Sequence, residues 1–192
     1  MKPLPEYLPG ESGLVLRRWV TADAPRLAQA VGESLEHLRP WMPWVAQEPV
    51  PLAERHQRIA TWEQDWRAGG DLVMGVFVDG AVAGGCGLHH RIGPKGLEIG
   101  YWIHPAFLRQ GIATAAARLL TNAALHQAEI TRVEIHHDKA NVASAGVPLK
   151  LGFRLMREVP DEPEAPGEIG ISCEWQVRRA EWAPFPIGSP AT

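Results

Sequence analysis

Residues 98–114, EIGYWIHPAFLRQGIAT, hold the change of pattern that decides how this chain folds. The first part predicts a strand closed by Pro105, and apolar residues then recur from Ile112 at the spacing of one helical face. Because the surrounding stretch is rich in alanine, we expect a long helix over about 111–127. A strand therefore passes into a helix through one short loop.

The loop before this helix is suited to an anion. The first N–H groups of a helix have no partners within it, and the helix dipole adds partial positive charge there. Gly111 and Ala113 leave the backbone uncovered, Arg109 adds a guanidinium, and Thr114 adds a hydroxyl donor. Such a loop can hold a phosphate or pyrophosphate, although a glycine at this place is also a common turn residue.

The flanking segments predict alternating strands and helices. Residues 71–103 hold two β-rich runs joined at Asp79-Gly80, a dipeptide suited to a tight hairpin, and a third strand, so we expect an antiparallel meander. The other expected elements are a strand over 14–19, two helices of which the second ends at Gly69, a strand over 132–137, a short helix ending at Gly152, and strands over 153–159 and 169–179.

The composition is that of a globular protein. With 192 residues, of which 45% are hydrophobic, we expect a single domain over 1–192, with a core over about 14–178 and an irregular tail over 180–192. The net charge of −3 argues against direct nucleic-acid binding. Two distant cysteines indicate reduced thiols, and no apolar run suits a secretory signal or a membrane span. We therefore expect a cytoplasmic protein without membrane contacts.

Four segments occur in a telling order: HLRPWMPW, the strand end EIGYWIHPAF, the loop RQGIAT, and RVEIHHDKANVASAGVPLKLGF. Together they resemble the GNAT N-acetyltransferase superfamily, and most closely its RimJ/RimL-type branch, over about residues 14–178. The resemblance implies an α+β fold in three layers. Its central, mostly antiparallel sheet is flanked by helices and splayed between the fourth and fifth strands, where the pantetheine arm of acetyl-CoA inserts.

The resemblance also implies which residues hold acetyl-CoA as the cosubstrate. Backbone contacts to the pantetheine would come from the strand residues Ile99, Tyr101, Trp102 and Ile103. The pyrophosphate would be cradled by Arg109, Gln110, Gly111, Ile112, Ala113 and Thr114. Asn141 would hydrogen-bond the cofactor arm, and Ser144 would lie near the thioester sulfur.

Acetyl transfer to an amine requires a neutral amine, and the departing thiolate is helped by a proton donor. Glu98 matches a position where many members of the superfamily carry a general base that acts through water; on the residues alone it could equally be a structural carboxylate. Ser144 is the candidate proton donor. A hydroxyl that caps the start of a helix is the alternative for it.

Histidines and tryptophans supply the other candidates. Adjacent histidines on a strand point to opposite faces, so the pairs at 89–90 and 136–137 do not predict a metal site. His89 or His90 is instead expected on the acceptor side, as base or substrate contact, with an ordinary half-buried histidine as the alternative. Trp41 and Trp44 are expected to form a wall of the acceptor pocket. Helix-on-sheet packing is the expectation for Trp62 and Trp66.

These observations predict an acetyl-CoA-dependent N-acetyltransferase. Direct attack in a ternary complex is expected, because no cysteine lies in the motif segments as an acyl carrier. The RimJ/RimL likeness implies a protein N-terminal α-amine as acceptor. A small-molecule amine (antibiotic, amino acid or polyamine) is the first alternative, and a non-catalytic acyl-CoA-binding module is the second. A monomer or a homodimer fits the sequence equally well.

Overall fold

The computed structural model describes residues 4–183. Its strands, in chain order, are β1 (Tyr7–Pro9), β2 (Leu14–Arg18), β3 (Leu72–Val78), β4 (Ala81–His89), β5 (Gly96–Ile103), β6 (Arg132–Asp138), β7 (Arg154–Pro160) and β8 (Ile171–Arg178). Its α-helices are α1 (Ala24–Gly32), α2 (Leu35–Leu38), α3 (Leu52–Arg67), α4 (Ile112–His126) and α5 (Val142–Lys150). Short 3-10 turns occur at η1 (Thr21–Asp23), η2 (Pro43–Gln47) and η3 (Pro105–Phe107).

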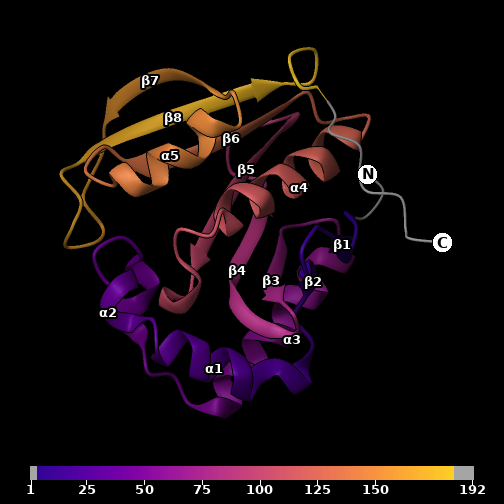
Figure 1. The fold of residues 1–192 in the computed structure, drawn as a ribbon, viewed down its shortest axis with the longest axis vertical. Helices are drawn as coiled ribbons and strands as arrows, with labels where there is room; N and C mark the ends of the chain where they lie inside the picture. The colour runs from indigo at the N-terminus through magenta and orange to yellow at the C-terminus, as the bar shows by residue number, and fades with distance from the viewer. Residues whose placement is uncertain (1–3, 184–192) are drawn as a thin grey trace.

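The strands form one sheet in the order β1-β2-β3-β4-β5-β6-β8-β7. Neighbours run antiparallel except β5 and β6, which are parallel and pair only from Gly96–Arg132 to Glu98–Glu134. Beyond Glu98 the two strands separate, and Figure 1 shows the β6-β8-β7 part turned away from the rest of the sheet. The predicted splay is therefore confirmed. It was expected between the fourth and fifth strands, and because the structure has an additional first strand, β1, the same place in the sheet falls between β5 and β6.

The predicted order of strands and helices is otherwise that of the structure. The meander turns at Asp79 and Gly80, whose φ angles of 47° and 79° are the left-handed values that this dipeptide tolerates. The short elements β1, α2, η2 and η3 lacked a periodic signal and were missed. The tail is irregular over 180–183, and the rest of that prediction lies outside the described residues.

The two faces of the sheet carry different clusters. On one face α4 buries its alanines and Leu120 against the main core, together with Leu97, Ile99 and Ile103 of β5. On the opposite face a smaller cluster holds α1 and α3, and Trp102 packs against it. Side chains alternate along a strand, so Glu98 and Gly100 share the face of Trp102, whereas Tyr101 belongs to the α4 face.

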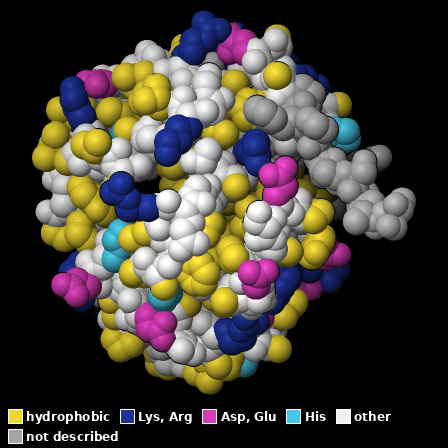
Figure 2. Space-filling view, viewed as in Figure 1, with side chains coloured by type: hydrophobic (Ala, Val, Ile, Leu, Met, Phe, Trp, Pro, Cys, Tyr) yellow, Lys and Arg dark blue, Asp and Glu magenta, His cyan; other side chains and the backbone are white. Residues whose placement is uncertain are grey.

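The outer surface is mixed in charge. On the face drawn in Figure 2, lysine and arginine side chains are scattered among acidic and apolar ones rather than gathered in one patch. No helix in the described part of the chain is long and apolar enough to cross a membrane.

Candidate active site

A cavity of about 580 Å³ opens where β5 and β6 part. Its lining comes from α1, β3, β4, β5, the far end of β6, the start of α5, α3 and the segment before α3, and the β7–β8 loop. It gathers nine of the residues predicted for the site: Trp41, Trp44, His89, Glu98, Ile99, Tyr101, Trp102, Asn141 and Ser144. Ile103 is buried and does not line it, and neither do His90 and residues 109–114.

Glycines shape the floor of this cavity on β4 and β5. A Cβ on Gly85 would meet the Trp102 indole at 2.5 Å, and one on Gly87 would meet the backbone oxygen of Leu72 at 2.6 Å. On Gly100 a Cβ would lie 3.3 Å from Nε2 of His89. Larger side chains at these positions would displace the indole and imidazole rings that now face the cavity.

Glu98 is buried and held by Arg91. Nε of Arg91 donates to Oε2 of Glu98 at 2.8 Å, and a terminal guanidinium nitrogen donates to Oε1 at 2.6 Å. This ion pair raises the pKa of Arg91, although burial opposes the shift. Nδ1 of His136 lies 3.7 Å from Oε2 of Glu98. Both oxygens of the predicted base are thus already engaged.

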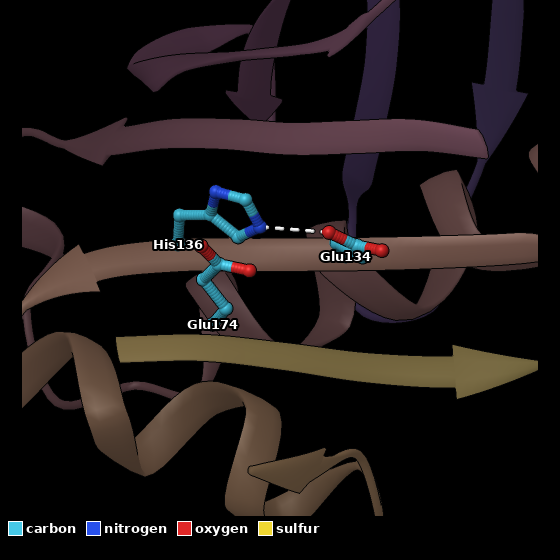
Figure 3. Close-up of side chains that lie close together, drawn as sticks. All are labelled: Glu134, His136 and Glu174. Carbon is cyan, nitrogen blue, oxygen red and sulfur yellow. Dashed lines mark hydrogen bonds and ion pairs between the residues drawn. The ribbon is translucent and has the colours of Figure 1, made fainter. Parts of the chain in front are cut away.

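A second polar network, drawn in Figure 3, lies beside it on β6 and β8. Possible ligand atoms of Glu134, His136 and Glu174 lie within 4.8 Å of one another. Arg132 donates to Glu134 at 3.0 Å and Arg157 donates to Glu174 at 2.6 Å, so guanidinium groups already compensate the carboxylates. We therefore describe this cluster as a network of ion pairs.

The network sets the charge of its two central groups. Burial would raise the pKa of Glu134, but hydrogen bonds from His136, Gln176 and Arg132 lower it to about 2. Burial would lower the pKa of His136, but the hydrogen bond to Glu134 and the charge of Glu98 raise it above its ordinary value.

Ser144 faces Tyr101 across the parting of the strands. Its Oγ lies 2.9 Å from Oη of Tyr101, which also donates to the Ser144 backbone oxygen at 3.2 Å. The start of α5 is capped by Asn141, whose Oδ1 accepts the backbone N–H of Ser144. Asn141, and not Ser144, therefore caps the start of α5 with its side chain. Burial, partly offset by the bond to Ser144, raises the pKa of Tyr101 to about 12.

The predicted anion loop leads into α4 as expected. Arg109 and Gly111 have φ angles of 60° and 79°, and Gly111 is the N-cap residue. No side chain caps the helix, and space around a Cβ at Gly111 is open. Gln110, Gly111 and Ile112 line a second cavity, of about 380 Å³, against the β1–β2 turn. The first backbone donors of α4 are therefore available to a ligand.

The two histidines at the end of β4 differ. His89 lines the main cavity, and its Nδ1 lies 2.7 Å from Oδ2 of Asp71. His90 is exposed, and its backbone N–H donates to Oδ1 of Asp71 at 2.8 Å.

Tryptophans line part of the cavity, and their role toward an acceptor stays a prediction. Trp41 and Trp44 both line the cavity, and Trp44 packs on Trp102 with ring centroids 6.3 Å apart. Trp62 also lines it, in addition to packing on the smaller core cluster. Trp66 packs against the main core and donates to the backbone oxygen of Leu4, as a structural residue does.

Sequence reasoning missed several polar residues of the site. Asp71, Arg91 and the loop carboxylates Glu164 and Glu168 were not singled out, and His136 was considered only for a metal site that the sequence did not predict. Their only signal was position: Asp71 begins the meander, and Arg91 follows the two histidines. Which side chains they reach depends on strand register and loop path, neither of which a residue pattern gives.

Comparison with known proteins places this site in a family. The family described as Acetyltransferase (GNAT) domain matches residues 13–154, most of the chain. This chain belongs to the GNAT acetyltransferase family. The family prediction is confirmed, and the chain is a GNAT acetyltransferase of the RimJ/RimL-like branch.

Three similar proteins illustrate the likeness. YdaF of Bacillus subtilis (strain 168), whose name provisionally assigns it as a ribosomal N-acetyltransferase, is 30% identical over 142 residues, 73% of this GNAT chain and 77% of YdaF. RimL, a ribosomal L7/L12 α-N-protein acetyltransferase in complex with coenzyme A, is 22% identical with a TM-score of 0.82, covering 90% of this chain and 98% of RimL. The microcin C7 self-immunity acetyltransferase MccE, in complex with acetyl-CoA and AMP, is 19% identical with a TM-score of 0.81, covering 92% and 98%. The two solved structures support the fold alone.

Proposed function

We propose that this GNAT acetyltransferase transfers the acetyl group of acetyl-CoA to the N-terminal α-amine of a protein, by direct attack in a ternary complex. The observation that carries the proposal is the cavity at the parting of β5 and β6. One wall presents His89, Glu98 and tryptophans, and the opposite side presents the Tyr101–Ser144 pair. A donor and an acceptor could therefore meet between two sets of polar groups.

The residues present fit acetyl-CoA. The uncapped start of α4, with Gly111 open to solvent, suits a pyrophosphate, and the unpaired stretch of β5 after Glu98 offers backbone groups to a pantetheine. Bound there, acetyl-CoA supplies the activated acetyl thioester. The names of RimL and MccE, which bind coenzyme A and acetyl-CoA, support the same assignment.

On the α4 side of the sheet, Ser144 holds a proton for the leaving sulfur. Its hydroxyl is placed by Tyr101, whose raised pKa keeps the phenol protonated. Ser144 can therefore give its proton to a thiolate and take one from Tyr101. Asn141 holds the start of α5 in place through its cap and leaves its amide N–H groups for the cofactor arm.

Direct transfer is favoured by the state of the one cysteine in the cavity. Cys86 is buried, and burial raises the pKa of its thiol. A protonated, buried thiol is a poor nucleophile, so Cys86 does not suit an acyl carrier. The acceptor itself is the attacking group.

The rim of the cavity supports a cationic acceptor. Glu164 and Glu168 of the β7–β8 loop line it, and among the described residues neither is joined to a basic group by an ion pair. The names of YdaF and RimL point to ribosomal proteins. An N-terminal amine has a pKa of roughly 7.7–8.0, against about 10.4 for lysine, so it arrives partly neutral and needs only a weak base.

The test is an acceptor screen with acetyl-CoA, read by thiol release and by the mass of the acceptor. The panel holds peptides with free N-termini, the same peptides blocked at the N-terminus but carrying lysine, and small amines. We expect acetylation of the free N-termini and its loss when they are blocked. Acetylation of small amines alone would favour the alternative that the cavity volume also allows, since ligand pockets span roughly 300–1,000 Å³. Binding of acetyl-CoA without any transfer would favour a non-catalytic module.

A further inference from the structure

His89 reaches the cavity through a gap made by two glycines. Its ring lies across β4 and β5, with Nε2 2.9 Å from where a Cβ on Gly87 would stand and 3.3 Å from one on Gly100. Any larger residue at either position would obstruct it. Within residues 4–183, Nε2 has no hydrogen-bond partner, while Nδ1 is fully engaged by Asp71. The free nitrogen therefore stands over the strand whose outer part is left unpaired by β6.

Asp71 fixes the form of this ring. Its Oδ1 is held by the backbone N–H of His90 at 2.8 Å, and its Oδ2 lies 2.7 Å from Nδ1 of His89. Burial would raise the pKa of Asp71, but these hydrogen bonds outweigh it and lower the pKa, so the carboxyl is ionised and only accepts. Nδ1 must then carry the hydrogen, and in the neutral ring the lone pair is on Nε2.

We propose that His89, oriented by Asp71, is the general base that takes the proton of the acceptor amine at Nε2. The assignment rests on the proposed function, since it needs an amine as acceptor. Asp71 is a positioning residue, which acts only through the ring.

Glu98 is the competing candidate, and its surroundings suit another role. Both of its oxygens accept hydrogen bonds from Arg91, whereas Nε2 of His89 is free. Glu98 pairs with His89 in the register of β4 and β5 and shares its face of the sheet. Glu98 is therefore a cross-strand neighbour of His89 whose carboxylate serves as the ion-pair partner of Arg91.

The proton balance of the transfer is complete with these groups. The acceptor ammonium gives one proton to Nε2, and the amine lone pair forms the N–C bond at the acetyl carbon while the C–S bond breaks. The nitrogen loses its second proton as the amide forms, and the sulfur takes one from Ser144. The second amine proton replaces, by way of water and Tyr101, the one that Ser144 has given up. One proton is released to solvent through His89 in each turnover.

The charged groups around His89 come from four elements. Before β3 these are Asp71 and, at the end of α3, Asp65, whose Oδ2 accepts the Asp71 N–H. On β5 and after β4 they are Glu98, Arg91 and His90, whose Nδ1 lies 3.3 Å from Oδ1 of Asp71. The remaining charged side chains that line the cavity are Glu48, Arg55, Arg58, His136, His137, Asp138, Glu164 and Glu168. A pH profile must therefore be compared between variants rather than interpreted alone.

The test compares kcat/KM against pH for His89→Gln, His90→Gln, Asp71→Asn and Glu98→Gln, with the N-terminal peptide that the wild type acetylates. The control is His126→Gln, an exposed histidine at the end of α4. We expect His89→Gln to lower kcat/KM about 100-fold near pH 7, where the amine is mostly protonated, and much less at pH 9. Asp71→Asn should lower it about tenfold with the same pH trend, and acetyl-CoA affinity should not change in either.

A second measurement needs no acceptor. Long-range proton–nitrogen NMR spectra of the labelled protein, recorded above the titration of the ring, should show His89 with its hydrogen on Nδ1. A hydrogen on Nε2 would overturn the assignment. The assignment would also be overturned if Glu98→Gln or His90→Gln showed the pH-dependent loss of kcat/KM while His89→Gln kept a kcat/KM near that of the wild type. If the wild type acetylates no amine at all, the proposed function fails and this assignment fails with it, whereas the preceding outcomes refute the assignment alone.

Discussion

Removing the guanidinium of Arg91 should destabilise the protein through Glu98. The Glu98 side chain is 8% exposed and accepts two hydrogen bonds from Arg91, at 2.8 and 2.6 Å. Truncating one partner of a fully buried ion pair costs about 3–5 kcal/mol. The Arg91 side chain is 60% exposed, so water reaches the ion pair and replaces part of the stabilisation that the guanidinium gives to the Glu98 carboxylate. We therefore expect Arg91→Gln to lower the free energy of unfolding by about 1–2 kcal/mol.

The assay is urea denaturation of Arg91→Gln, Glu98→Gln and the double variant at pH 8. In the Glu98→Gln background no carboxylate is left unpaired, so Arg91→Gln should cost only a few tenths of a kcal/mol there, which gives a coupling energy of about 1 kcal/mol. At pH 5.5 the loss should shrink, because protonated His136, with Nδ1 3.7 Å from Glu98, takes over part of the compensation. Equal losses from Arg91→Gln in both backgrounds would refute the reasoning.

Two further predictions concern the cofactor loop and the network on β6. Gly111→Asp should weaken acetyl-CoA binding at least about tenfold in calorimetry, because it places a negative charge at the start of α4. The matched control is Gly111→Asn, since asparagine has nearly the same size as aspartate and tolerates a left-handed φ. Equal affinities of the two variants for acetyl-CoA would contradict a pyrophosphate site. Since the folded-state pKa of His136 is raised above its ordinary 6.5, its contribution to stability is complete below that pH and is lost as the pH rises through the raised value. His136→Asn should thus cost more stability at pH 6 than at pH 9 in urea denaturation, and a pH-independent cost would argue against the ion pairs.

Much of the fold could be predicted from local pattern. The period-2 run of the meander, the Asp79-Gly80 turn and the alanine-rich face of α4 each specify their element within a few residues. β1 and the short helices were missed because three to five residues carry too little periodicity. The family segments added what periodicity cannot give, namely the splay between the strands.

For the site, the sequence supplied candidates and the tertiary structure decided their partners. Tyr101 was predicted only for its backbone, yet its hydroxyl meets Ser144, 43 positions later. Glu98 was predicted as a base that acts through water or as a structural carboxylate, and the path of the loop after β4 brings Arg91 to it. Such contacts depend on how distant segments pack, which no local window contains.

The pair of Asp71 and His89 shows where the sequence alone stops. The sequence determined that both residues lie at the open end of a hairpin and that strand side chains alternate between faces. A two-residue turn at Asp79-Gly80 with regular pairing would set Asp71 opposite Leu88. Instead the register shifts between Val76 and Phe77, so that Leu72 pairs with Leu88 and the next position faces His89. That single bulged residue decides which side chain the carboxylate meets, because a shift of one residue exchanges the two faces of a strand.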